Sequence, residues 1–166
     1  MAFPRRQTAI TLLEILIVVA LIGVIAAVAV PRISRGARGA ADSDVLTSLV
    51  TLRSAIDLYY REHNFTYPAQ DNSPETFIDQ LTKRTDAQGN VGANPDIYIY
   101  GPYLYGDIPA ISVGPNRGAN GVFVAGTGPT VDESLTTIGW VYNSTTGDLI
   151  ANTDDRDETG LGYELY

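Results

Sequence analysis

Residues 10–30 read ITLLEILIVVALIGVIAAVAV, a mostly apolar stretch of 21 residues in which Glu14 is the only charged side chain. A helix of roughly 20 apolar residues is long enough to cross the hydrocarbon core of a bilayer. The whole chain has 166 residues, enough for one globular domain of ordinary size. Such a domain has no core that could surround this helix on every side. The stretch therefore predicts a membrane helix or an export signal rather than a buried core helix.

An ordinary secretory signal peptide is one interpretation of the N-terminal segment. Arg5 and Arg6 form a basic region before the apolar stretch, and Ala27-Val28-Ala29 is an A-x-A cleavage pattern near its end. Cleavage after Ala29 would release an exported soluble binding domain that begins at Val30. A retained membrane helix is the competing interpretation.

Glu14 argues against a disposable export signal. A carboxylate near the middle of an apolar helix costs about 2.5–3.5 kcal/mol on insertion scales, and less near the membrane surface. A signal peptide that is removed after export gains nothing from a carboxylate that makes membrane insertion less favourable. The alternative is that Glu14 simply lies at the level of the lipid headgroups, and the residues alone leave both explanations open.

A second helical pattern follows the apolar stretch. Between residues 44 and 61, apolar side chains recur at spacings of four, three, four and three residues, which places them on one face of a helix. Pro31, Gly36 and Gly39 are expected to kink or loosen a helix locally without stopping it. We therefore expect one helix from about residue 10 to residue 63, roughly 80 Å long at 1.5 Å per residue. The residues of the apolar stripe are Val45, Leu49, Leu52, Ile56 and Tyr59.

Charge and composition exclude several classes of function. The net charge is −8, divided into +2 for residues 1–63 and −10 for residues 64–166, which argues against binding of nucleic acid through phosphates. The absence of cysteine excludes a disulfide framework, a thiolate zinc site and a cysteine nucleophile. His63 is the only histidine. Because we find no pair of nucleophile and base and no phosphate-binding loop, we do not expect an enzyme.

The remainder of the chain predicts a small α+β head. Ser73-Pro74-Glu75 is typical of a helix start, with Ser as N-cap and Pro at the first position. Residues 97–100 and 122–124 are β-prone, and residues 139–142 and 148–151 flank a turn as a hairpin. We therefore expect a three- or four-stranded antiparallel sheet packed on the second half of the long helix.

The N-terminal residues resemble a known family. The run RRQTAITLLEILIV at residues 5–18, followed by the rest of the apolar stretch and Pro31, is similar to the processing site of type IV pilins and of the pseudopilins of type II secretion. The resemblance implies cleavage between Ala9 and Ile10 by a prepilin peptidase, methylation of the new amine of Ile10, and assembly into a helical filament. It also implies that Glu14 of one subunit meets the Ile10 amine of its neighbour, so that two charges in an apolar setting are paired.

The resemblance implies a division of the chain and a location. Residues 1–9 would be the leader peptide, 10–31 the transmembrane and filament-core helix, 32–63 its amphipathic continuation, and 64–166 the globular α+β head of a type IV pilin-like fold. We expect a single-pass protein of the inner membrane with its head in the periplasm or outside, and later a filament. The expected partners are other copies of the chain, the prepilin peptidase, membrane lipid, and an inner-membrane secretion or pilus assembly platform. Glu14 and Pro31 are the residues expected to matter for assembly.

The head resembles that of the major pseudopilins in outline, which implies a subunit of a type II secretion pseudopilus. A type IV pilin used for adhesion, motility or DNA uptake is the alternative within the family, and the exported soluble domain remains the alternative outside it. Major pseudopilins bind calcium in the C-terminal loop. Residues 155–160 open like an EF-hand-like loop but lack its final Glu, so calcium competes with a plain acidic surface loop. The candidate ligands are Asp154, Asp155, Asp157 and Glu158.

Two further features have ordinary structural explanations. His63 at the end of the long helix is expected to interact with the helix C-terminus. A group of tyrosines is expected to pack in the sheet and loops, although a contact surface for sugar or for the filament is the alternative. These tyrosines are Tyr98, Tyr100, Tyr103 and Tyr105.

Overall fold

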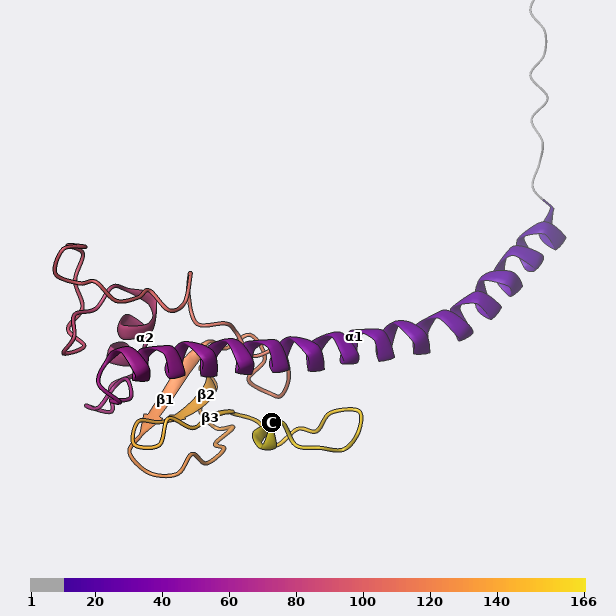
Figure 1. Ribbon diagram of the computed structural model, residues 1–166. Coiled ribbons are helices and arrows are strands. Elements are labelled where there is room, and N and C mark those ends of the chain that lie inside the picture. The colour runs from indigo at the N-terminus through magenta and orange to yellow at the C-terminus, as the bar shows by residue number, and fades with distance from the viewer. Residues whose placement is uncertain (1–10) are drawn as a thin grey trace, which may run out of the picture. The chain divides into compact units, whose positions relative to one another are not determined.

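The computed structural model describes the backbone of residues 11–166 and the side chains of that range except residues 28–35 and 37. The elements follow one another as helix α1, helix α2, strands β1, β2 and β3, and the short 3₁₀ helix η1 (Figure 1). The chain divides into two compact units, with the boundary between Arg38 and Gly39. The expected α+β class is confirmed.

Helix α1 spans Leu12–Glu62 as one continuous element of 51 residues. The expectation of a single long helix is confirmed, and the helix passes through Pro31, Gly36 and Gly39 without a break. Its C-terminal part belongs to the second unit, Gly39–Tyr166, together with all the remaining elements. The second half of α1 is therefore the central helix of the head.

The apolar stripe of α1 forms one wall of the head's core. All five residues of the stripe are buried, with exposed fractions of 3% or less. They join one hydrophobic cluster with side chains of α2 and the sheet, among them Phe77, Trp140 and Tyr142. Burial of large apolar side chains is the dominant stabilising contribution to a domain of this size. The periodicity of residues 45–59 thus correctly predicted which face of the helix is covered.

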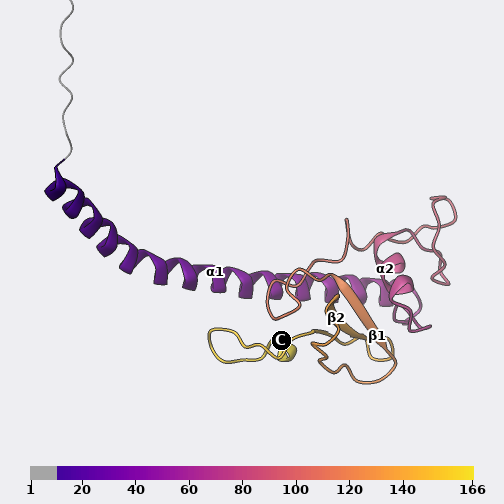
Figure 2. The same ribbon diagram turned by 180° about the vertical axis from the view of Figure 1, so that it is seen from behind.

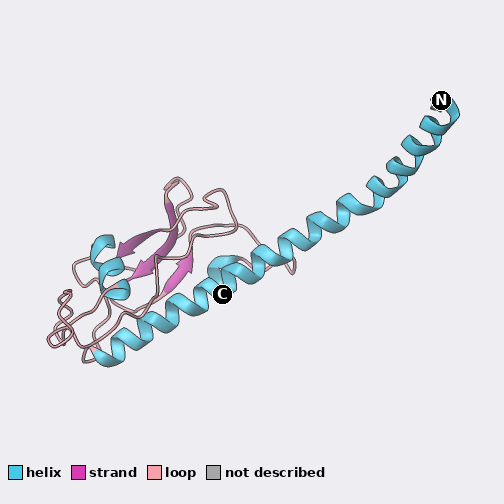
Figure 3. Cartoon of the chain, turned by 90° about the horizontal axis from the view of Figure 1, so that it is seen from above, coloured by secondary structure: helices cyan, strands magenta, loops and turns pink. Residues whose placement is uncertain are grey.

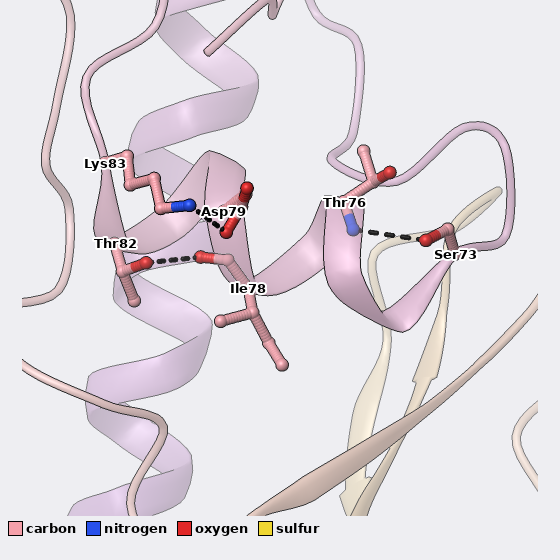
Figure 4. Close-up of polar contacts among 6 residues, drawn as sticks. All are labelled: Ser73, Thr76, Ile78, Asp79, Thr82 and Lys83. Carbon is pink, nitrogen blue, oxygen red and sulfur yellow. Dashed lines mark hydrogen bonds and ion pairs between the residues drawn. The ribbon is translucent and has the colours of Figure 1, made fainter. Parts of the chain in front are cut away.

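Helix α2 spans Pro74–Thr82 and begins as the sequence predicts. Oγ of Ser73, the N-cap, accepts a hydrogen bond from the backbone N–H of Thr76 at 3.2 Å (Figure 4). Pro74 occupies the first helical position, where the missing N–H costs nothing. Phe77 and Leu81 bury the apolar side of the helix against the core.

The sheet contains three strands in the order β1–β2–β3, spanning Gly121–Ala125, Ile138–Asn143 and Leu149–Ala151. Strand β2 pairs with β3 in an antiparallel hairpin, as predicted, and Gly147 in its turn adopts φ +79°, a conformation that favours glycine. Strand β1, however, pairs with β2 in parallel. The sheet is therefore mixed, and the expectation of a purely antiparallel sheet was wrong for this pair.

The connection between the two strands is long enough to permit parallel pairing. Residues 126–137 separate β1 from β2, and parallel strands need a crossover of about a dozen residues or more. The register shifts between Gly121 and Val122, because Gly139 is the extra residue of a bulge in β2. Figure 3 shows the three strands beside the C-terminal half of α1, within the second unit, and Figure 2 shows β1 and β2 from behind.

The β-prone residues 97–100 do not form a strand. Tyr100 makes only an isolated bridge with Thr85, through backbone hydrogen bonds of 3.0 and 3.1 Å. Ile97 and Ile99 are more than half exposed. The local sequence favours an extended conformation here. Among the described residues, however, no strand lies beside this segment to continue the hydrogen bonding beyond the single bridge.

Candidate functional site

The predicted processing site begins outside the described residues. Ala9 and Ile10, between which we expect cleavage, both lie in the part of the chain that the structure does not describe, as do the arginines of the leader. The description starts at Thr11. Cleavage and methylation thus stay predictions from the sequence.

Glu14 lies in the first turn of α1, next to the cap of the helix. Its backbone N–H donates to Oγ1 of Thr11 at 3.2 Å and also approaches the Thr11 carbonyl oxygen at 3.1 Å. Thr11-x-x-Glu14 is the sequence pattern of a capping box, and a carboxylate in the first turn also interacts favourably with the helix dipole. The sequence already contains this pattern. The interpretation of Glu14 from the sequence considered only the membrane and a neighbouring subunit. The hydrogen bonds shown here use the backbone N–H of Glu14, so the local contribution of its carboxylate is the interaction with the helix dipole.

The side chains of the first part of α1 are exposed on all sides. From Leu12 to Ile25, the large apolar side chains have exposed fractions between 47% and 85%. A helix that is apolar all round requires apolar surroundings, and an exposed patch of this kind marks a membrane or protein contact. Within the residues that the structure describes, no helix reaches the length and hydropathy of a membrane span.

Pro31, the second residue expected to matter in assembly, lies inside α1. A proline has no N–H to donate to the carbonyl group four residues earlier, so the helix lacks one backbone hydrogen bond at this point. The position of Pro31 within the helix agrees with the expectation from the sequence, and its role in assembly stays a prediction.

Asp157 organises the C-terminal loop. Its Oδ1 accepts hydrogen bonds from the backbone N–H groups of Thr159 and Leu161 at 2.8 and 2.9 Å, and its Oδ2 accepts one from the hydroxyl of Tyr166. The Thr159 hydroxyl donates to the same carboxylate. These hydrogen bonds, that of Tyr166 foremost, lower the pKa of Asp157 to about 2. The carboxylate is thus occupied by its own loop.

The same loop is fastened to α1 by two polar side chains. The hydroxyl of Tyr163, in η1 (Tyr163–Leu165), donates to Oδ1 of Asp42 at 2.5 Å. Nη2 of Arg53 donates to the carbonyl oxygen of Tyr166 at 2.5 Å. Burial and the carboxylate of Asp42 raise the pKa of Tyr163 above its usual range. The C-terminus is therefore held on the helix by hydrogen bonds in a chain that has no cysteine for a disulfide.

The described residues show no ready-made cluster of calcium ligands in the C-terminal loop. Of the predicted ligands, Asp154, Asp155 and Glu158 are exposed and Asp157 is occupied as described. The described residues contain no group of three His, Cys, Asp or Glu side chains that could hold a metal, whereas calcium takes six to eight oxygen ligands. Oε2 of Glu164, which is not among the ligands predicted from the sequence, is buried without a hydrogen-bond partner among the described residues. Calcium binding stays a prediction from the resemblance.

His63 interacts with the end of α1, as predicted. Its Nδ1 lies 2.9 Å from the carbonyl oxygen of Tyr59, its Nε2 lies 3.0 Å from Oγ1 of Thr85, and its ring stacks on Tyr59 at 3.8 Å. Burial raises the pKa of Tyr59 to about 12. This arrangement is packing at a helix end rather than a catalytic site.

Of the four tyrosines named in the sequence analysis, three are at least partly buried and one is exposed. Tyr98 and Tyr100 are half-buried, and Tyr103 packs against the core and donates from its hydroxyl to Oε2 of Glu62 at 2.6 Å. Tyr105 is 95% exposed. Packing is thus the role of three of them, and Tyr105 is free for a contact.

The sequence does not predict a structural role for Arg53. It lies on the polar side of the helical pattern, where charged side chains usually meet water. Its two acceptors, in Leu149 and Tyr166, are about a hundred residues away, and no local spacing points to them. The structure alone reveals that it joins α1 to the sheet and to the C-terminus.

Residues 4–30 match the family model of the prokaryotic N-terminal methylation motif. The match contains the predicted cleavage junction, Glu14 and the apolar stretch that enters α1. It supports a type IV pilin-like protein, which is processed by a prepilin peptidase, methylated, and assembled into filaments. Such a protein is membrane-anchored or associated with a pilus, and its class is generally structural rather than enzymatic.

The match to the methylation motif does not distinguish a type IV pilin from a pseudopilin. No curated protein and no solved structure matches the chain.

Proposed function

We propose that the chain is a structural subunit of the pseudopilus of a type II protein secretion system. The observation that carries this proposal is the methylation motif at residues 4–30, which leads directly into the exposed apolar part of α1. A helix that presents apolar side chains on every side cannot stay in water and requires lipid or other copies of itself. Lipid provides these apolar surroundings before assembly, and neighbouring helices provide them in the filament.

The N-terminal residues have distinct roles in this proposal. The prepilin peptidase cuts between Ala9 and Ile10, and the leader with Arg5 and Arg6 stays in the cytoplasm. The new amine of Ile10 is methylated and keeps its positive charge. Glu14 of a neighbouring subunit meets this amine, because an unpaired charge in an apolar filament core is costly and an opposite charge offsets the cost.

The chain acts in two places in turn. It is first a single-pass protein of the inner membrane with residues 39–166 in the periplasm, where an assembly platform takes it up. It then becomes part of a filament whose core consists of the apolar helices and whose surface consists of the heads. The folded head, which has its own hydrophobic core, supports this division.

The order of elements in the head supports a pseudopilus more than a pilus. A short helix after the long one, a small sheet and an acidic C-terminal loop are the features of the resemblance to major pseudopilins. Many type IV pilins close the C-terminal region with a disulfide, which this chain cannot form. A type IV pilin for adhesion, motility or DNA uptake is the alternative.

Mass spectrometry of the mature protein from its native membrane tests the class. The proposal expects an N-terminus at Ile10 that carries one additional methyl group. An N-terminus at Val30 would instead show an ordinary signal peptide and an exported soluble domain.

Deletion of the gene in the native host separates the two kinds of filament. Loss of protein secretion with surface pili intact supports the pseudopilus, and loss of surface pili with secretion intact supports the pilus. Complementation with the wild-type chain is the control in both cases.

A further inference from the structure

A groove of about 470 Å³ lies on the head, between α1 and the loop after α2. Thr47 and Thr51 of α1 form one side, and Tyr103, Tyr105 and Asp107 of the loop form the other. All the lining residues belong to the second unit. A volume of this size accommodates a large side chain or a small ligand.

Three hydroxyl groups of the groove already donate hydrogen bonds within the chain. The hydroxyl of Thr47 donates to the carbonyl oxygen of Ser43 at 2.8 Å, and that of Thr51 donates to the carbonyl oxygen of Thr47 at 2.7 Å. Tyr103 likewise donates to Glu62. Because these hydroxyl protons are already in use, the oxygens offer only lone pairs to a ligand. At these three positions the groove favours a ligand that brings its own donors.

The charge and the aromatic rings of the groove favour a cation. Asp107 is exposed and carries a negative charge, and none of the described residues that line the groove is basic. Tyr105, 95% exposed, offers a ring face at the rim. A guanidinium or ammonium group supplies several donors and is attracted both to a carboxylate and to the face of a tyrosine.

The chain itself contains a segment with this chemistry. After removal of the leader, residues 10–38 contain three basic and one acidic residue, a net charge of +2, whereas residues 39–166 contain six basic and eighteen acidic residues, a net charge of −12. Three of the basic residues remain close together in the chain after the leader is removed. They are Arg32, Arg35 and Arg38.

We infer that the groove receives an arginine of the segment 32–38 from a second copy of the chain. The carboxylate of Asp107 pairs with the guanidinium, and Tyr105 covers its flat face. A planar guanidinium suits this combination better than an ammonium group, because it stacks on aromatic rings and keeps its charge. The inference rests on the proposed filament and names one contact between its subunits.

Cysteine cross-linking in assembled filaments tests this contact directly. The chain has no native cysteine, so any disulfide comes from the introduced pair. Tyr105→Cys is combined in turn with Arg32→Cys, Arg35→Cys and Arg38→Cys, and the filaments are oxidised. We expect disulfide-linked dimers for at least one of the three pairs. The matched control is Ile97→Cys, which is also exposed but is not part of the groove, with the same arginine replacements.

Charge reversal provides the second measurement. Asp107→Arg is expected to lower filament yield at least tenfold, and Asp96→Arg, an equal change of charge at another exposed position, is expected to leave it unchanged. Membrane insertion and processing of both variants should match the wild type.

The inference is overturned if none of the three pairs forms dimers in filaments, if the Ile97→Cys control forms them equally, or if Asp107→Arg assembles normally. These results differ from a failure of the proposed function, in which the wild-type chain itself would form no filament.

Discussion

Nη2 of Arg53 in α1 lies 2.7 Å from the carbonyl oxygen of Leu149 in β3, and its Nε lies 3.2 Å from the same oxygen. The same guanidinium reaches the carbonyl oxygen of Tyr166. Burial lowers the pKa of Arg53, and the carboxylate of Asp148 partly offsets this effect. One side chain in the C-terminal part of α1 therefore holds both the last strand and the C-terminus.

Because these contacts all lie within Gly39–Tyr166, a fragment that starts at Ser34 is expected to fold as a soluble monomer. It retains the buried stripe of α1 and omits the exposed apolar stretch. Circular dichroism and analytical ultracentrifugation measure the result. An unfolded or insoluble product would mean that residues before Ser34 are required for the core.

Replacement of Arg53 by Met is expected to destabilise this fragment by about 1.5–3 kcal/mol, because two carbonyl groups lose a charged hydrogen-bond donor. Urea unfolding measures the change. Arg61→Met is the matched control, since Arg61 makes only an exposed pair with Asp57 at 2.8 Å on the same helix, worth about 0.3–0.5 kcal/mol. Equal effects of the two variants would show that the contacts of Arg53 with Leu149 and Tyr166 add no more stability than an exposed ion pair.

Asp157 gives the head a defined sensitivity to acid. Its pKa is about 2 in the folded state and about 3.9 for an unperturbed Asp. A lowered pKa in the folded state contributes stability above the unfolded pKa, and this contribution is lost as the pH falls from about 4 towards about 2. We expect Asp157→Asn to be less stable than the wild type at pH 7 and to lose less stability over this interval.

Thermal unfolding of the fragment as a function of pH measures this effect. Asp154→Asn is the control, because Asp154 is exposed in the same loop. If the two variants unfold alike at every pH, the hydrogen bonds of Asp157 do not stabilise the loop.

The same unfolding experiment tests the prediction of calcium binding. A site at the C-terminal loop predicts a higher unfolding midpoint in millimolar calcium than in a chelator, because a ligand that binds only the folded state stabilises it. The rise should disappear in Asp155→Ala, and Glu164→Gln tests the buried carboxylate oxygen that has no partner among the described residues. A rise that sodium chloride reproduces at equal ionic strength is general screening and assigns no metal.

Glu14→Ala is expected to insert into the membrane at least as well as the wild type, since a charge is removed from an apolar helix. Filament assembly should fail, because the amine of Ile10 loses its proposed partner. The structure also provides a control for effects on the helix start. Thr11→Ala removes the hydrogen bond of the cap and retains the carboxylate.

Thr11→Ala is therefore expected to assemble nearly as well as the wild type. Filament yield measured by electron microscopy and by sedimentation distinguishes the two variants. Loss of filaments in both variants to the same extent would assign the effect to a disturbed helix start rather than to charge pairing.

The sequence by itself determined the features that depend on neighbouring residues. The spacing of Val45 to Tyr59 predicted the buried face of α1, because a helix repeats every 3.6 residues and only one face meets the core. Ser73 and Pro74 predicted the start of α2, and the turn before Leu149 predicted the β2–β3 hairpin. The methylation motif likewise required no structure.

Only the tertiary structure decided the features that join distant parts of the chain. The parallel pairing of β1 with β2, the failure of residues 97–100 to form a strand, and the contacts of Arg53 each depend on which segments become neighbours. Strand propensity fixes a backbone shape but not its partner, since pairing depends on packing and on the connections between strands. A polar side chain on a helix meets either water or a distant carbonyl group, and only the packed head determines which.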